Sequence, residues 1–206
     1  MKKFSKLMLL AMLFASTSCG FMNPYVVNYS ISLASVESPL DAKRTFGDTK
    51  VVSLDDDGFS KYRFEDDYIE ITWAVTHKNF LFELKNKTEY TIKINWDDVC
   101  YVDVNGKAGR VMHSGVKYID RNSSQPATII PKGASISDLL LPTDNVSYGG
   151  GWSEKPLIEY VYYDEAKKNT IAPTYVGKQM SVIMPILIEN VQNEYIFVFN
   201  IDGIIE

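Results

Sequence analysis

Apolar and polar residues alternate with a period of two in three consecutive runs near the middle of the chain. The runs cover residues 69–76, 80–85 and 90–96, and two short polar loops separate them. Alternation of this kind places one set of side chains in a core and the other in water, as in a half-buried β-strand. We therefore predict a three-stranded antiparallel meander, in which Trp73 and Trp96 fall on the core-facing side.

Shorter patterns extend the prediction of strands toward both ends of the chain. Residues 26–36 predict a first strand, and residues 181–189 and 194–201 predict a closing pair joined by the short loop between them. The dipeptide Asn105-Gly106 tolerates positive φ at both positions, so it predicts a two-residue hairpin. Only residues 164–169 have a helical pattern, and they are too few for a long helix.

The spacing of these strands and turns predicts an all-β protein built as an antiparallel β-sandwich. An immunoglobulin-like arrangement is the first choice, and a jelly roll or a closed barrel is the alternative. The Cys…Trp…Cys spacing of antibody domains does not occur in the chain. We expect one sandwich domain over residues 48–206, preceded by an anchor segment and the first strand over residues 19–47.

The first nineteen residues have the composition of an export signal. Three lysines precede an unbroken apolar run (residues 7–15), and three small residues then lead to Cys19. This run is far shorter than the roughly 20 residues that cross a bilayer, so export followed by cleavage is the better interpretation. The segment resembles the signal of bacterial lipoproteins. The resemblance implies that residues 1–18 are removed as a signal peptide and that Cys19 becomes the lipidated first residue, whereas plain secretion with cleavage near Ser18 is the alternative.

Composition limits the partners of the mature chain. The hydrophobic (46%) and charged (23%) fractions are those of an ordinary globular protein. Without residues 1–18 the chain keeps 18 of its 21 basic residues against 26 acidic ones, a net charge of −8. That balance argues against a nucleic-acid partner and against electrostatic adhesion to anionic lipid. We expect the lipid anchor to provide the membrane contact and to place the protein in the cell envelope, either periplasmic or surface-exposed.

Few residues could support catalysis. The chain contains two histidines, His77 and His113, and two cysteines. His77 lies in a predicted hairpin loop, and His113 and Ser114 are neighbours on a predicted strand, so their side chains point to opposite faces. Two aspartates precede Cys100 and would raise the pKa of its thiol, so we interpret it as a small buried hydrophobic residue. We expect surface or rim histidines, no catalytic residue and no cofactor.

Acidic residues gather in predicted turns on both sides of one strand pair. Asp55, Asp57, Asp66 and Asp67 are the weak calcium candidates, because Ca²⁺ takes six to eight oxygen ligands and such turns could supply them if they converge. Their spacing does not match an EF-hand loop. The turn preference of aspartate produces the same pattern without a metal, and we expect no metal site.

The aromatic residues around one glycine-rich stretch are the candidate ligand-binding residues. Tyr148 precedes Gly149–Gly151, and Trp152 follows it. Exposed aromatic side chains on loops at the end of a sandwich often bind sugar rings or a protein partner; a ring folded back over the end of the domain is the alternative. We expect a non-enzymatic binding or structural module with a protein or glycan as partner. The alternative is a hydrolase that acts on envelope or extracellular polysaccharide through paired carboxylates.

Overall fold

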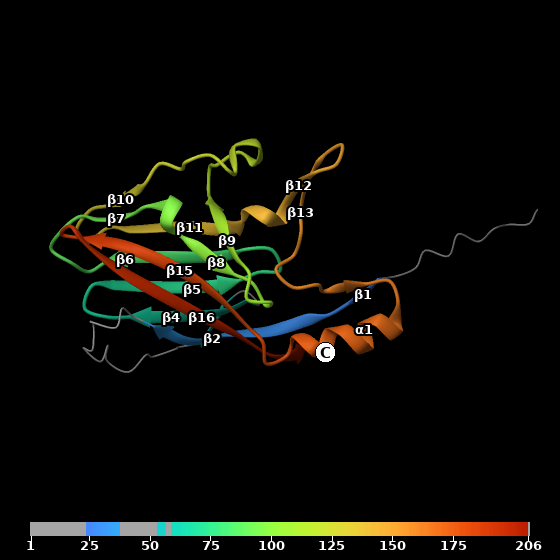
Figure 1. Cartoon of the computed structure of the whole chain (residues 1–206). Coiled ribbons are helices and arrows are strands. Elements are labelled where there is room, and N and C mark those ends of the chain that lie inside the picture. Colours follow the sequence, from blue (N-terminus) through green and yellow to red (C-terminus); the bar gives the residue numbers. More distant parts are fainter. Residues whose placement is uncertain (1–23, 38–52, 57–58, 206) are drawn as a thin grey trace, which may run out of the picture.

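The computed structural model describes residues 24–37, 53–56 and 59–205. Antiparallel strands dominate this part of the chain, together with the short helix α1 (Glu165–Ile171) and four 3-10 turns, so the all-β prediction is confirmed (Figure 1). The strands are β1 (Tyr25–Val26), β2 (Asn28–Glu37), β3 (Ser53–Asp56), β4 (Phe59–Glu65), β5 (Ile69–Val75), β6 (Phe80–Asn86), β7 (Ile92–Ile94), β8 (Cys100–Val102), β9 (Ala108–His113), β10 (Thr128–Ile130), β11 (Ser135–Pro142), β12 (Val146–Tyr148), β13 (Trp152–Glu154), β14 (Val161–Tyr162), β15 (Gln179–Ile188) and β16 (Val191–Ile205). The 3-10 turns are η1 (Trp96–Asp98), η2 (Tyr118–Asp120), η3 (Thr143–Asn145) and η4 (Ala172–Tyr175).

Twelve of these strands form one continuous sheet that curls into a nearly closed barrel. Its main path runs β2-β16-β15-β8-β9-β11-β6-β5-β4-β3, and β7 and β10 extend from β15. Strand β2 lies beside β4, so the two ends of the path approach each other without pairing (Figure 1). The predicted alternative of a barrel therefore describes the sheet better than two separate layers do, and the immunoglobulin-like arrangement is not confirmed.

Strand β9 makes the sheet continuous. Its first half pairs with β8, through Ala108 to Arg110, and its second half pairs with β11, through Val111 to His113. A strand that changes partners along its length turns the corner between the two sides of a core. The sequence pattern of β9 does not reveal this change of partner.

The predicted meander is correct for its first two strands and wrong for the third. Strands β5 and β6 pair as expected, but the edge of β6 is taken by β11, while β7 pairs with β10 and β15 on the other side of the barrel. The buried side chain of Asn86 marks the crossing, because its amide donates to the carbonyl oxygens of Tyr90 (2.7 Å) and Ile130 (3.0 Å). The first meander in the structure is instead β3-β4-β5-β6.

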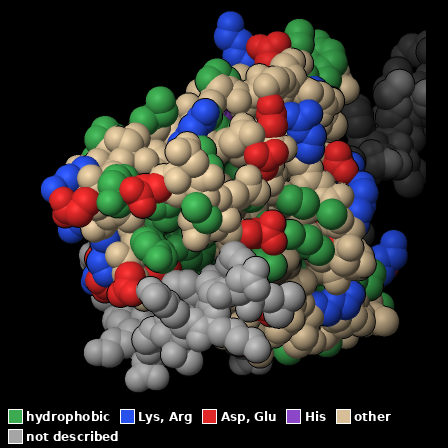
Figure 2. Space-filling model, turned by 60° about the vertical axis from the view of Figure 1, so that its left-hand side comes forward, with side chains coloured by type: hydrophobic (Ala, Val, Ile, Leu, Met, Phe, Trp, Pro, Cys, Tyr) green, Lys and Arg blue, Asp and Glu red, His purple; other side chains and the backbone are tan. Residues whose placement is uncertain are grey.

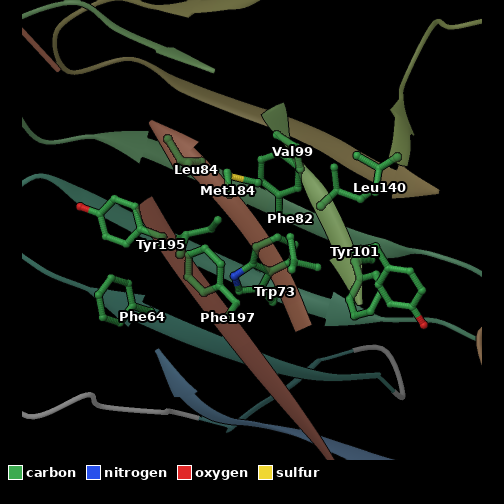
Figure 3. Packing of buried hydrophobic residues seen from close by; sticks show 14 of the residues in the cluster. Phe64, Trp73, Phe82, Leu84, Val99, Tyr101, Leu140, Met184, Tyr195 and Phe197 are labelled. Carbon is green, nitrogen blue, oxygen red and sulfur yellow. The ribbon is translucent and has the colours of Figure 1, made fainter. Parts of the chain in front are cut away.

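The core contains a cluster of aromatic rings, which confirms the buried positions of Trp73 and Trp96. Figure 3 shows Trp73 between rings from opposite sides of the barrel. Its ring centroid lies 5.2 Å from Phe82 of β6 and 5.0 Å from Phe197 of β16. Tilted contacts of this kind are the preferred geometry of aromatic pairs, and they join the two sides of the sheet.

The C-terminal pair is confirmed, but its turn is shorter than predicted. Strands β15 and β16 pair from Gln179 to Ile188, and only Glu189 and Asn190 connect them. Both residues have positive φ (48° and 68°), as a two-residue hairpin with the twist of the strands requires. On one edge, β15 pairs with β8 through Ser181 to Ile183 and with β7 through Ile186 to Ile188. Pro185 lies between these two ladders, so its missing N–H interrupts neither of them.

Three further predictions have mixed outcomes. The first strand is confirmed as β2, which pairs with β16 over most of its length. The predicted two-residue hairpin at Asn105-Gly106 is wrong in the length of its loop. The β8–β9 ladder ends at Val102 and Ala108, so five residues form the connection. Gly106 has a φ of 79° within it. The short helix is confirmed as α1, whose N-cap Asp164 accepts hydrogen bonds from two backbone N–H groups of the first turn.

Candidate functional site

Trp152 lies in a strand rather than in a loop, which corrects the sequence prediction. Strands β12 and β13 form a separate two-stranded ribbon in which Tyr148 pairs with Trp152. Gly149–Gly151 form its turn, and Gly150 has a φ of 82° that favours glycine. In Figure 1 this ribbon projects from the barrel as a narrow hairpin.

Four side chains from two segments gather at the ribbon and form what we call the aromatic patch: Tyr118, Arg121, Tyr148 and Trp152. The ring centroid of Trp152 lies 5.2 Å from that of Tyr148 and 5.7 Å from that of Tyr118. The guanidinium carbon of Arg121 lies 5.4 Å from the Trp152 ring centroid. Trp152 is 41% exposed and Tyr148 is 66% exposed, so the rings contact one another and remain open to solvent.

Hydrogen bonds and an ion pair around Tyr118 and Glu154 hold the aromatic patch in place. The Tyr118 hydroxyl donates to the carboxylate of Glu154 in β13, and this bond raises the pKa of Tyr118. Lys78 forms an ion pair with the same carboxylate at 3.5 Å. Arg121 donates from Nη1 to the carbonyl oxygen of Tyr118 (2.9 Å). Because these bonds form before any ligand is present, ligand binding costs less conformational entropy than it would at a flexible site. Sequence reasoning found Tyr148 and Trp152 but missed Tyr118 and Arg121, which are about 30 residues away along the chain.

A groove with a volume of about 400 Å³ lies between the start of β2, the start of β4 and the end of β5. Tyr29, His77 and Ile158 are among its lining residues, and no Asp or Glu occurs among the described residues that line it. The Tyr29 hydroxyl donates to the carbonyl oxygen of Glu159 (3.2 Å), and burial raises the pKa of Tyr29. His77 stacks on Tyr160 with 4.1 Å between the ring centroids, and desolvation lowers its pKa. The sequence did not indicate this groove.

His113 is more buried than a surface or rim histidine. Its side chain is 14% exposed and stacks on Trp96, with 4.2 Å between the centroids. Its Nδ1 atom lies 3.1 Å from Oδ2 of Asp138. Across the described ranges no hydroxyl or thiol hydrogen-bonds to this ring. The half-buried thiol of Cys100 contacts the carbonyl oxygen of Tyr101 instead, at 3.6 Å.

Of the four calcium candidates, the structure describes the side chains of Asp66 and Asp67. The Asp66 carboxylate accepts hydrogen bonds from the backbone N–H groups of Tyr68 and Ile69 (2.7 Å each) and from the Tyr195 hydroxyl (2.8 Å). Burial raises the pKa of Asp66 despite these bonds. Asp67 is exposed beside it. Asp57 and the lipidation candidate Cys19 lie outside the described residues, and so does the side chain of Asp55. No group of three or more His, Cys, Asp or Glu residues that could hold a metal ion occurs among the residues described.

Comparison with known proteins identifies no relative of this chain: no family model, no curated protein and no solved structure matches it. Within residues 24–37, 53–56 and 59–205, no helix has the length and apolar character needed to cross a membrane. On the face shown in Figure 2, basic and acidic side chains are mixed rather than gathered into a block of one sign.

Proposed function

We propose that this chain is a lipid-anchored cell-envelope protein that binds glycan through the aromatic patch. The observation that carries the proposal is the cluster of Trp152, Tyr148 and Arg121: the two rings are exposed on a projecting ribbon, and the Arg121 guanidinium lies 5.4 Å from the Trp152 ring centroid. Aromatic faces stack on sugar rings, and a guanidinium donates hydrogen bonds to sugar hydroxyl groups.

The small size of the patch favours a glycan over a protein partner. The ribbon strands are only three residues long, and its exposed rings are those of Tyr148 and Trp152. A stable protein interface needs about 800 Å² on each partner, several times what two side chains offer. One or two sugar rings need no more surface than this.

Iodide quenching of tryptophan fluorescence tests the glycan proposal. Trp73 and Trp96 are buried, so aqueous iodide reports on Trp152. We expect soluble peptidoglycan fragments to protect this emission from iodide, and the change Arg121→Ala to reduce the protection. Tyr90→Ala, an exposed tyrosine far from the ribbon in the sequence, is the matched control. If iodide quenches equally with and without the fragments, the aromatic patch does not bind this glycan.

The lipid anchor is a separate part of the proposal. It rests on the resemblance of residues 1–19 to lipoprotein signals and on a mature net charge of −8, which gives the domain no electrostatic affinity for anionic membranes. Cys19→Ala should move the protein from the membrane fraction to the soluble fraction. Retention of this variant on membranes would contradict anchoring.

The alternative function is a polysaccharide hydrolase with paired carboxylates; the described residues that line the groove include no Asp or Glu that could supply such a pair.

A further inference from the structure

Strands β1 and β14 form a second small ribbon outside the barrel sheet. Tyr25 pairs with Tyr162 and Val26 pairs with Val161. Tyr162 is buried and packs with Val27 and Ala172 against the body of the protein. Because paired residues share a face and successive residues alternate, the ribbon has one inner face, which contains Tyr162, and one outer face.

The outer face of this ribbon is apolar and open. Val26 is 53% exposed, and its partner Val161 is half-buried. Tyr163, two residues after Val161, is 64% exposed. Lys168 of α1 lies at the edge of the ribbon, with its Nζ atom 5.8 Å from the Tyr25 ring centroid on the inner face. We call Val26, Val161 and Tyr163 the outer face of the ribbon.

The chain outside the described residues determines what this face can reach. Cys19 precedes Pro24, the first described residue, by five positions, and five residues span at most about 18 Å even when fully extended. An acyl chain on Cys19 would enter the bilayer at its interfacial layer, which is about 5–8 Å thick on each side. The ribbon therefore stays within about 18 Å of the anchor point, so its outer face can reach the interfacial zone where tyrosine is enriched.

We infer that the outer face of the β1–β14 ribbon docks on the lipid bilayer to which the protein is anchored. The inference rests on the proposed lipid anchor. Val26 and Val161 supply apolar surface, and Tyr163 supplies a ring with a polar hydroxyl. The acidic domain needs no electrostatic attraction to dock, because the anchor already holds it at the membrane. Figure 1 shows β1 and α1 together at the same end of the molecule.

Quenching of tryptophan by brominated lipid tests the docking directly. The full lipidated chain is reconstituted into phosphatidylcholine vesicles with or without bromine on the acyl chains. The variant carries Tyr163→Trp together with Trp152→Phe, so that its only exposed tryptophan lies on the outer face. The matched control carries Tyr90→Trp with the same Trp152→Phe change, because Tyr90 lies near Glu189 at the β15–β16 turn. We expect brominated lipid to reduce the emission of the Tyr163→Trp variant and to leave that of the control unchanged.

Flotation of the vesicles separates failure of docking from failure of the anchor. If both variants float with the vesicles and neither is quenched by bromine, the anchor holds and the docking inference is wrong. If residue 163 is instead shielded from iodide but not quenched by bromine, a second copy of the chain covers the face, and the inference is also wrong. If the protein does not float, the lipid anchor fails and the docking fails with it. Val26→Glu, which places a charge on the same face, should abolish the quenching while flotation persists.

Discussion

The two buried tryptophans differ in one respect that makes them a matched pair for a stability measurement. Nε1 of Trp96 donates to the hydroxyl of Thr128 at 2.8 Å. Nε1 of Trp73 is buried and finds no acceptor among the described residues. Both indoles are almost completely buried, so replacing each with phenylalanine removes a similar amount of apolar surface. We predict that Trp96→Phe destabilises the protein more than Trp73→Phe does.

The expected difference follows from the hydrogen bond and from the unpaired donor. Trp96→Phe removes a bond with a net value of about 1 kcal/mol and leaves the Thr128 hydroxyl without this donor. Trp73→Phe removes a buried N–H whose unpaired state costs about 1–3 kcal/mol, which offsets part of the lost packing. The two variants should therefore differ by at least about 2 kcal/mol in the free energy of unfolding.

Urea unfolding followed by circular dichroism measures this difference. With an m-value of about 2 kcal/mol per molar urea, the midpoint of Trp96→Phe should lie about 1 M below that of Trp73→Phe. Thr128→Val completes a double-mutant cycle: it should destabilise the wild-type chain and have little further effect in the Trp96→Phe variant. Equal midpoints for the two tryptophan variants would refute the reasoning, since packing alone would then determine the cost.

Three other predictions concern buried polar groups and the aromatic patch. Asn86→Ala should destabilise the protein by about 3 kcal/mol in urea unfolding, because the buried Ile130 carbonyl loses its amide donor and the buried Thr88 N–H loses its acceptor, whereas the exposed Asn95→Ala should cost little. The raised pKa of Asp66 means that the folded state binds its proton more tightly than the unfolded state, so Asp66 should lower stability as the pH rises from about 4 through this raised pKa. Asp66→Asn should remove that loss, and an unchanged pH profile would contradict it. Trp152→Ala should leave the unfolding midpoint nearly unchanged, and a large drop would show that its ring supports the fold.

The sequence predicted the strands well because alternation depends only on which side of each strand faces the core. It could not predict their neighbours. Residues 92–94 alternate like residues 80–84, yet β7 pairs with β15 rather than with β6. An alternating strand fits beside any partner that covers its apolar face, so long-range pairing decides its place in the barrel. The two-residue turn at Glu189 and Asn190 could not be predicted, because glutamate is not a residue type that favours positive φ.

The candidate site was half predictable for the same physical reason. Tyr148 and Trp152 flank one glycine turn, so local sequence identified them together. Tyr118 reaches the patch from η2 and Arg121 from the residue that follows it, and the hydrogen bond between Tyr118 and Glu154 joins this segment to the ribbon. His113 was misjudged because nothing near it in the sequence indicates that Trp96 covers its ring. Contacts between distant segments define these environments.

The aromatic patch and the proposed membrane-docking face each include a two-stranded ribbon. This arrangement predicts which parts of the protein unfold locally. The β12–β13 and β1–β14 ribbons belong to no larger sheet, whereas β5 and β15 each pair with neighbours on both sides. A two-stranded ribbon is marginally stable alone, so it should open locally at a lower free energy than the barrel. Amide hydrogen exchange should therefore be faster at Ser147 and Ser153 than at Ile71 and Val182. If the ribbons are protected as strongly as β5 and β15, they unfold only with the barrel, and substitutions in them would change stability as well as binding.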